Sequence, residues 1–300
     1  MDSIFRIDSI SILHELLGYD KPKHPLITLI DLNNINPTIA YRNKQFVIGF
    51  YTITLKNGIA CDVKYGRRYY DFREGSLMFM APEQVTAVDY SRDKKEAEGW
   101  MLCFHPDLIR KSVLDSKMKE FTFFSYDTSE ALHLSEKEKE IITNIVETIK
   151  NEFSQNIDVY SQDLIVSNIE VLLNYCNRFY GRQFITRTTV NKDLISHFDT
   201  LLREYFNSES LGEKRIPSVK HLAKEMGYSA NYLSDLLKKE TGKNTQEHIH
   251  FQLLEKAKTL LLGTSEPISQ IAYTLGFEYP AHFSKFFKAK TGMSPMTFRK

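Results

Sequence analysis

The amino-acid sequence predicts a multidomain α+β protein with an N-terminal antiparallel β-barrel, a helical segment and an all-α C-terminal domain. Three observations predict this fold class: short runs rich in β-branched and aromatic residues, then two amphipathic runs, then an internal repeat of helical character. The expected segments are a barrel at 1–130, a helix pair at 131–181, a linker at 182–192 and a helical domain at 193–300.

Six candidate strands lie between residues 46 and 105, and turn residues separate them. They are Phe46–Leu55, Ile59–Lys64, Arg67–Phe72, Ser76–Ala81, Gln84–Tyr90 and Gly99–His105. The Asn57-Gly58 pair favours the left-handed backbone of a two-residue hairpin. Short strands at this spacing are typical of a sandwich or barrel, and we expect an antiparallel barrel or jelly roll.

Two amphipathic helices are expected next. Ser135 and Glu138 form a capping box, in which both side chains bind free backbone N–H groups at a helix start. Apolar residues then recur at helical spacing along two runs: Ile141, Ile142, Ile145, Val146, Ile149 and Phe153, and then Leu164, Ile165, Ile169, Leu172, Leu173, Cys176 and Phe179. Such stripes must be buried, on the flank of the barrel or in a dimer interface, and both can hold at once. We expect the pair to serve dimerisation.

The net charge of +1 conceals an asymmetry along the chain. Residues Lys214–Lys300 carry 14 lysines and arginines against 7 aspartates and glutamates, a net charge of +7, which leaves −6 on residues 1–213. This asymmetry indicates an acidic or neutral module joined to one that faces nucleic acid or a membrane. No run approaches the roughly 18 apolar residues that span a bilayer, and the first residues lack the pattern of a signal peptide. We therefore expect a cytoplasmic protein with no membrane partner.

The most informative feature is an internal repeat. Residues Val219–Gly242 recur as Ile268–Gly292, at an offset of 49 that becomes 50 after one inserted residue. Leu222-Ala223 corresponds to Ile271-Ala272, Met226-Gly227-Tyr228 to Leu275-Gly276-Phe277, and Thr241-Gly242 to Thr291-Gly292. Each copy has the residues of a helix-turn-helix: a small alanine where two helices approach, and a glycine four residues later for the tight turn. We place the two units at about 218–240 and 267–290.

A helix is expected between the two units, at Gln246–Leu262. At about 1.5 Å per residue it would span roughly 26 Å. This length is near the ~34 Å that separates successive major-groove faces on one side of DNA. Two such units on the basic part of the chain favour a DNA-binding domain over a plain helical bundle.

Residues 193–300 closely resemble the DNA-binding domain of the AraC/XylS family of bacterial transcription regulators. The second copy and its tail, residues 271–299, follow the family signature nearly throughout: IAYTLGFEYPAHFSKFFKAKTGMSPMTFR. One departure is Phe298, where the family often has tyrosine. Residues 99–109, GWMLCFHPDLI, are similar, more loosely, to the cupin-type regulatory domain of the same family. The resemblance implies a cupin-like N-terminal barrel and a transcription regulator that is more often an activator than a repressor.

By position, the resemblance implies base-reading residues in the second helix of each unit, which we name the recognition helix. The first offers Ala230, Asn231, Ser234 and Asp235, and the second offers Pro280, Ala281, His282, Ser284 and Lys285. Asn231 suits adenine and Lys285 suits guanine. Asp235 can only accept hydrogen bonds and repels phosphate, so the first unit is expected to bind less tightly, unless Asp235 stays solvated. The expected phosphate contacts are Lys238, Lys239, Lys243, Lys288 and Lys290.

The rival class is a cupin-type enzyme, whose metal site would need two or three histidines and a carboxylate. No histidine lies between Pro25 and Phe104, and His248 and His250, two apart on a helix, do not share a face. The three cysteines, Cys61, Cys103 and Cys176, suggest neither a disulfide framework nor a metal site. We expect no enzyme, no catalytic residues, no metal and no cofactor.

The expected partners are double-stranded DNA and a second copy of the chain, with RNA polymerase and a small-molecule effector as further partners. Barrel interiors can hold one small ligand. The aromatic residues between 46 and 100 either line such a pocket or form ordinary core. A ligand-independent DNA-binding regulator therefore stays open as an alternative.

Overall fold

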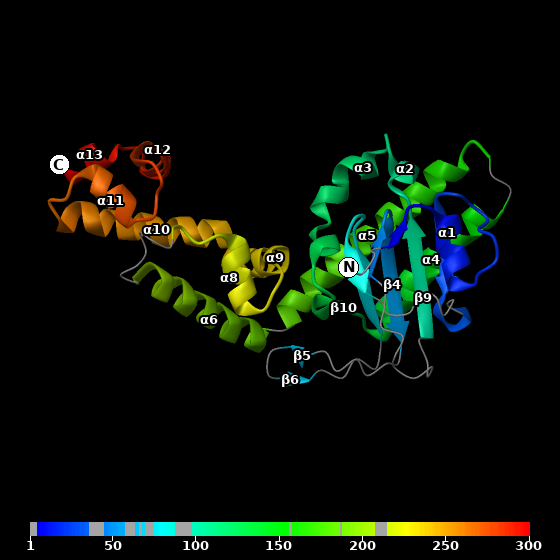
Figure 1. Cartoon of the computed structure of the whole chain (residues 1–300). Helices are drawn as coiled ribbons and strands as arrows, with labels where there is room; N and C mark the ends of the chain where they lie inside the picture. Colours follow the sequence, from blue (N-terminus) through cyan, green and yellow to red (C-terminus); the bar gives the residue numbers. More distant parts are fainter. Residues whose placement is uncertain are drawn as a thin grey trace. The chain divides into compact units, whose positions relative to one another are not determined.

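A computed structural model of the chain describes residues 5–35, 45–57, 64–65, 68–69, 75–87, 98–155, 158–186, 188–207 and 215–300 (Figure 1). The chain divides into two compact units, unit 1 at Met1–Gln183 and unit 2 at Phe184–Lys300. Unit 1 combines sheets with helices, whereas the described elements of unit 2 are helices joined by loops. Among the described helices, none has the length and apolar character that crossing a membrane requires.

Unit 1 is built on a five-stranded antiparallel sheet with the strand order β10-β7-β4-β9-β2. Its strands are β2 (Ile27–Asp31), β4 (Tyr51–Asn57), β7 (Ser76–Met80), β9 (Glu98–Phe104) and β10 (Leu132–His133). A three-stranded sheet has the order β1-β3-β8, and β5 pairs with β6. These strands are β1 (Phe5–Ile7), β3 (Gln45–Ile48), β5 (Lys64–Tyr65), β6 (Arg68–Tyr69) and β8 (Val85–Ala87). The described strands form open sheets, so the closed barrel is not confirmed.

The predicted strand Phe46–Leu55 is wrong as a single strand, because the chain changes sheet within it. β3 pairs with β1 and β8, whereas β4 pairs with β7 and β9. The change occurs at Gly49, whose N–H donates to Ile7 O at 2.9 Å. A Cβ atom at Gly49 would lie 2.8 Å from Asp8 Oδ1, at the movable end of a side chain, and 3.4 Å from the Asp8 Cα atom, so the chain passes close to Asp8 here.

Two other predicted strands, Ser76–Ala81 and Gly99–His105, are confirmed by β7 and β9. The predictions Ile59–Lys64 and Arg67–Phe72 lie mostly outside the described residues, as does the end of Gln84–Tyr90.

Helices cover both faces of the five-stranded sheet. Successive residues of a strand point to opposite faces. On one face, Cys103 and Ile30 pack with α1 (Ile10–Leu17) and with the three-stranded sheet in one hydrophobic core. On the other, Phe79 contacts Tyr180 of α5 (Ser161–Thr186), with ring centroids 6.0 Å apart. The remaining helical segments between the strands and α5 are α2 (Pro106–Ile109), α3 (Val113–Lys117), α4 (Glu136–Ser154) and 3-10 turns at Leu32–Asn34, Met118–Glu120, Thr122–Ser125 and Thr128–Glu130.

The predicted capping box at the start of α4 is present, since Ser135 and Glu138 bind each other's backbone N–H groups. The apolar stripes of α4 and α5 are largely buried within unit 1; these residues are Ile142, Val146, Ile149, Phe153, Ile165, Ile169, Leu172, Leu173, Cys176 and Phe179. Leu164, predicted as part of the stripe, is instead 47% exposed. Packing on the unit's own sheet thus accounts for most of both stripes, and dimerisation stays a prediction.

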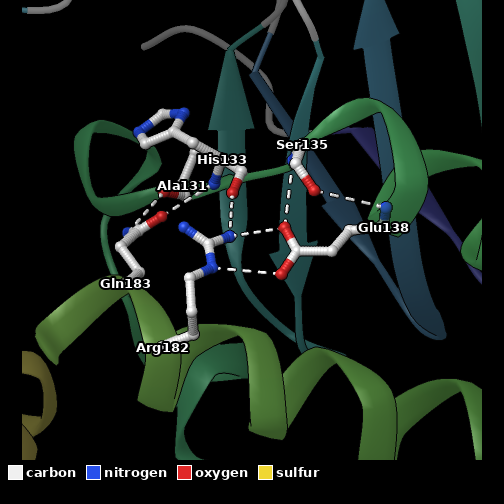
Figure 2. Close-up of polar contacts among 6 residues, drawn as sticks. All are labelled: Ala131, His133, Ser135, Glu138, Arg182 and Gln183. Carbon is white, nitrogen blue, oxygen red and sulfur yellow. Dashed lines mark hydrogen bonds and ion pairs between the residues drawn. The ribbon is translucent and has the colours of Figure 1, made fainter. Parts of the chain in front are cut away.

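The end of α5 is fastened to the start of α4 and to β10 (Figure 2). Arg182 donates to both carboxylate oxygens of Glu138, at 3.0 and 2.6 Å, and to the His133 carbonyl at 2.7 Å. Gln183 accepts from the His133 N–H and donates to the Ala131 carbonyl. A bidentate pair of this kind adds geometric specificity to charge attraction, so it fixes the orientation of α5 within unit 1.

Unit 2 contains the last residues of α5 and seven further described helices. They are α6 (Thr188–Asn207), α8 (Val219–Met226), α9 (Ala230–Thr241), α10 (Thr245–Gly263), α11 (Ile268–Thr274), α12 (Pro280–Thr291) and α13 (Pro295–Arg299). The segment predicted as a linker, 182–192, is helical wherever it is described, in α5 and α6. Asn191 is buried, and its Nδ2 donates to Phe184 O at 2.5 Å and to Glu240 Oε1 at 2.7 Å.

Candidate nucleic-acid interface

The two predicted helix-turn-helix units are α8 with α9 and α11 with α12 (Figure 1). Each pair meets over the predicted small residue, because Ala223 and Ala272 are both buried. The turn closes in the same way in both: Tyr228 N–H donates to Ala223 O at 2.9 Å, and Phe277 N–H donates to Ala272 O at 3.0 Å. The repeat in the sequence therefore reflects a repeat in the structure.

The two turn glycines share a left-handed backbone but differ in how closely other atoms approach them. Gly227 has a φ of 76° and Gly276 a φ of 84°, so both use the left-handed backbone that glycine adopts without steric cost. A Cβ atom at Gly227 would meet nothing within 4 Å, whereas one at Gly276 would lie 2.8 Å from the Arg215 carbonyl carbon. The second turn thus packs against the backbone before α8, and only glycine fits there.

The second recognition helix, α12, exposes most of its predicted base-reading residues. Ala281, His282 and Lys285 are exposed, and Pro280 and Ser284 are half-buried. Phe283 and Phe287 are fully buried on the opposite side of the helix. The two phenylalanines hold α12 on the domain core, so that a polar and basic face points outward. The predicted phosphate contacts Lys288 and Lys290 are exposed in its last turn.

The first recognition helix, α9, presents fewer of its predicted residues. Asn231 is exposed, while Ala230, Ser234 and Asp235 are half-buried. Ser234 Oγ donates to Thr245 Oγ1 at 3.0 Å, and Thr245 is fully buried at the start of α10. Sequence reasoning missed this contact. The one sign of it in the sequence is a difference between the two copies. Thr245 corresponds to Pro295, which has no hydroxyl group and cannot form this hydrogen bond.

Three further lysines were predicted as phosphate contacts near α9. Lys238 and Lys239 are exposed at its C-terminal end. Lys243 is also exposed, and its Nζ lies 4.4 Å from the ring centroid of Phe251 on α10. This cation–π contact restrains the lysine side chain while leaving it at the surface.

The connecting helix α10 runs for 19 residues, which corresponds to roughly 28 Å. Its two histidines face different neighbours. His248 Nε2 lies 2.8 Å from Thr241 Oγ1, at the end of α9. The His250 ring lies 5.3 Å from that of Phe286 on α12. Burial lowers the pKa of both histidines, and Lys243 and Lys290 lower it further for His248 and His250 respectively.

Comparison with known proteins finds matches among transcriptional regulators. Residues 222–300 match the family model of a helix-turn-helix domain. The chain is 35% identical over 82 residues to the HTH-type transcriptional regulator YobQ of Bacillus subtilis, a match that covers 27% of this chain and 34% of that protein. It is 26% identical over 231 residues to the arabinose operon regulatory protein of Salmonella typhimurium, covering 76% of this chain and 75% of that one. A crystal structure of an AraC-type regulator from Chromobacterium violaceum aligns at 23% identity, with a TM-score of 0.32, over 37% of this chain and 93% of that one.

The match to the first of these relatives spans only about a third of its length. The family model begins at Leu222 in α8 and continues to the last residue of the chain. Residues 222–300 therefore match a helix-turn-helix domain, and the chain is similar to transcription regulators that include the arabinose operon regulatory protein.

Proposed function

We propose that this protein is a cytoplasmic, sequence-specific DNA-binding transcription regulator, which inserts α9 and α12 into successive major grooves of double-stranded DNA. The observation that carries the proposal is the outward face of α12, where His282 and Lys285 are exposed above buried phenylalanines. A lysine donates to the O6 and N7 atoms of guanine, and a histidine donates to base acceptors or to phosphate. The length of α10 supports placement of the two recognition helices about one helical turn of DNA apart.

The test is selection of bound fragments from the genome, followed by binding measurements on the selected sequence at several salt concentrations. Affinity should fall steeply as salt rises, because bound lysines release counterions from DNA. Lys137→Ala is the negative control. It removes an exposed lysine of α4 in unit 1, so its DNA affinity at each salt concentration should equal that of the wild type. Failure to enrich any sequence, or binding that is insensitive to salt, would contradict the proposal.

Unit 1 is proposed to modulate DNA binding through α5. The helix is continuous from Ser161 to Thr186. Arg182 and Gln183 are bound within unit 1, and the next residue, Phe184, packs in unit 2 against Tyr232 of α9, with ring centroids 5.3 Å apart. A change in the contacts of Arg182 and Gln183 is therefore proposed to alter the packing of Phe184 on the first recognition helix.

Arg182→Met tests this modulation because it removes the bidentate pair with Glu138. Arg178→Met is the control, as Arg178 is exposed one turn earlier on the same helix. DNA affinity should change for Arg182→Met and not for Arg178→Met. Equal affinities for both variants would exclude a role for this contact in modulation.

A homodimer is proposed to form along the exposed side of α5. Leu164 and Val171 are 47% and 43% exposed and lie seven residues apart, so they share one face of the helix. Replacing both with glutamate should convert the dimer to a monomer. The molar mass, measured by light scattering of protein eluted from a size-exclusion column, checks this. Asn177→Glu, on another side of α5, is the control. A monomeric wild type would contradict the proposal.

Residues 1–130 are proposed to be a cupin-like sensing module for a small-molecule effector, and the regulator is proposed to be an activator that also contacts RNA polymerase. The shared core of the five-stranded and three-stranded sheets supports a double-sheet module of this kind. Trp100 of β9 is the one tryptophan of the chain. Its fluorescence during titration with candidate metabolites separates a sensing module from the alternative, a ligand-independent regulator.

A further inference from the structure

The residue before the second recognition helix is an exposed aromatic. Tyr279 occupies the N-cap position of α12 and is 55% exposed, and its side chain makes no capping hydrogen bond. In the first unit the same place is taken by Ser229, whose side chain caps α9 by accepting from the Tyr232 N–H. Serine is among the best N-cap residues, whereas tyrosine gives no such stabilisation. Tyr279 therefore occupies this position at the expense of helix stability.

The Tyr279 ring contacts a predicted base-reading residue. Its centroid lies 5.3 Å from that of the His282 imidazole, and the two ring planes meet at 74°. Edge-to-face packing of this kind is a favoured arrangement of aromatic rings. The backbone reinforces the pairing, because the His282 N–H donates to Tyr279 O at 3.0 Å.

We propose that Tyr279 is a specificity-determining residue of the second helix-turn-helix unit, which acts by positioning His282. An exposed imidazole in the first turn of a helix can occupy several side-chain rotamers. The tyrosine ring beside it restricts these rotamers before DNA arrives, so less side-chain freedom is lost when His282 meets a base edge. This inference rests on the proposed DNA-binding function and adds to it a residue outside the base-reading set predicted from the sequence.

The experiment uses the full-length chain and the DNA sequence selected by the wild type, together with a panel of single-base variants of that sequence. The proteins are wild type, Tyr279→Ser, Tyr279→Phe, His282→Ala and the double variant Tyr279→Ser/His282→Ala. Tyr279→Ser introduces the capping residue of the first unit, so the thermal stability of the helix should rise or stay unchanged. Tyr279→Phe keeps the ring and controls for the hydroxyl.

We expect Tyr279→Ser to lose about two- to tenfold in discrimination, the range that corresponds to ordering one side chain on binding. The loss should fall at the same base pair that His282→Ala ceases to read. Tyr279→Phe should discriminate as the wild type does. The double variant should lose no more than His282→Ala alone, because the two residues act as one unit.

The inference is overturned by an equal loss on all sequences, by a further loss in the double variant, or by unchanged discrimination in Tyr279→Ser. A loss accompanied by a lower melting temperature would mean that Tyr279 supports the fold and not the reading of DNA. If the wild type selects no sequence at all, the proposed function itself fails. If the wild type selects DNA and Tyr279→Ser matches it at every base pair, this inference fails and the proposed function stands.

Discussion

The two helix-turn-helix units share a backbone plan but differ in how they use it. In the first, Ser229 caps the recognition helix and Ser234 is bonded to Thr245. In the second, Tyr279 gives no cap, and the turn at Gly276 packs tightly on the Arg215 backbone. In the first unit, Ser229 and Ser234 thus form hydrogen bonds within the protein, whereas the second unit leaves His282 and Lys285 exposed at the surface of α12. The comparison shows that two copies of one fold can differ in which polar side chains form internal hydrogen bonds and which stay exposed.

The largest expected effect is on the free energy of unfolding, and it differs between the two turn glycines. Gly227→Ala should lower the free energy of unfolding by about 1–2 kcal/mol, the cost of a left-handed backbone for a residue with a side chain. Gly276→Ala should lower it by roughly 2–5 kcal/mol, because its Cβ atom would also overlap the Arg215 carbonyl carbon. Hydrogen exchange of peptides from α8–α9 and α11–α12 measures both. Equal losses would mean that the second turn has no need of its close approach.

The next effect concerns base reading. Lys285→Ala should weaken binding to the selected DNA by about 1–3 kcal/mol and relax specificity at one base pair. Asn231→Ala should cost less, since the first recognition helix presents fewer of its polar residues. Binding isotherms on single-base variants of the DNA give both values. If Lys285→Ala weakened all sequences equally, the lysine would be a phosphate contact, and Lys288→Ala provides the reference for that behaviour.

A smaller effect of opposite sign is expected in the first unit. Asp235→Asn keeps the size of the side chain and removes its negative charge, so repulsion from phosphates should fall. Affinity should rise by roughly two- to fivefold at about 0.1 M salt, on all sequences alike. Titrations at low and high salt measure the change, which should shrink as salt rises. An unchanged affinity would mean that the Asp235 carboxylate lies away from the DNA backbone.

The smallest effect is a pH dependence of unit 2. Burial lowers the pKa of His248 and His250 below the ordinary value of 6.5. The unfolded chain therefore binds more protons than the folded one as pH falls below about 6.5, and stability is lost in that range. Asp199 and Glu247 oppose the shift for His248, and Glu247 opposes it for His250.

Melting temperatures of the wild type, His248→Gln and His250→Gln between pH 7.5 and 5.5 test this pH dependence. Each variant removes one titrating imidazole and should therefore flatten part of the profile. His248→Gln removes the ring beside Thr241 of the first unit, and His250→Gln removes the ring beside Phe286 of the second. A flat wild-type profile would contradict the prediction.

The repeat was the part of the fold that the sequence predicted best. Alanine and glycine at fixed spacing are required by close helix approach and by a left-handed turn, and these are local needs that a sequence displays directly. The capping box of Ser135 and Glu138 was found for the same reason, because a cap involves neighbours in the chain. Long amphipathic stripes also gave α4 and α5 correctly, apart from Leu164.

Features that depend on distant residues were missed. At the change of sheet, the Gly49 N–H donates to the carbonyl of Ile7, far earlier in the chain, and no local pattern shows this contact. Strands β1 and β10 have three and two residues, too few for an alternating pattern to emerge. The Ser234–Thr245 hydrogen bond and the Tyr279–His282 contact also escaped prediction, since both depend on side-chain directions.

The contacts of Phe184 and Asn191 have a practical consequence for dissecting the chain. Phe184 packs on Tyr232, and Asn191 donates to Phe184 O and to Glu240. An isolated DNA-binding fragment that begins at 193 would discard all three contacts and expose the buried ring of Tyr232. Fragments and chimeras should therefore be joined upstream of Phe184, within the last turns of α5. A chimera joined there would keep all three of these contacts within unit 2.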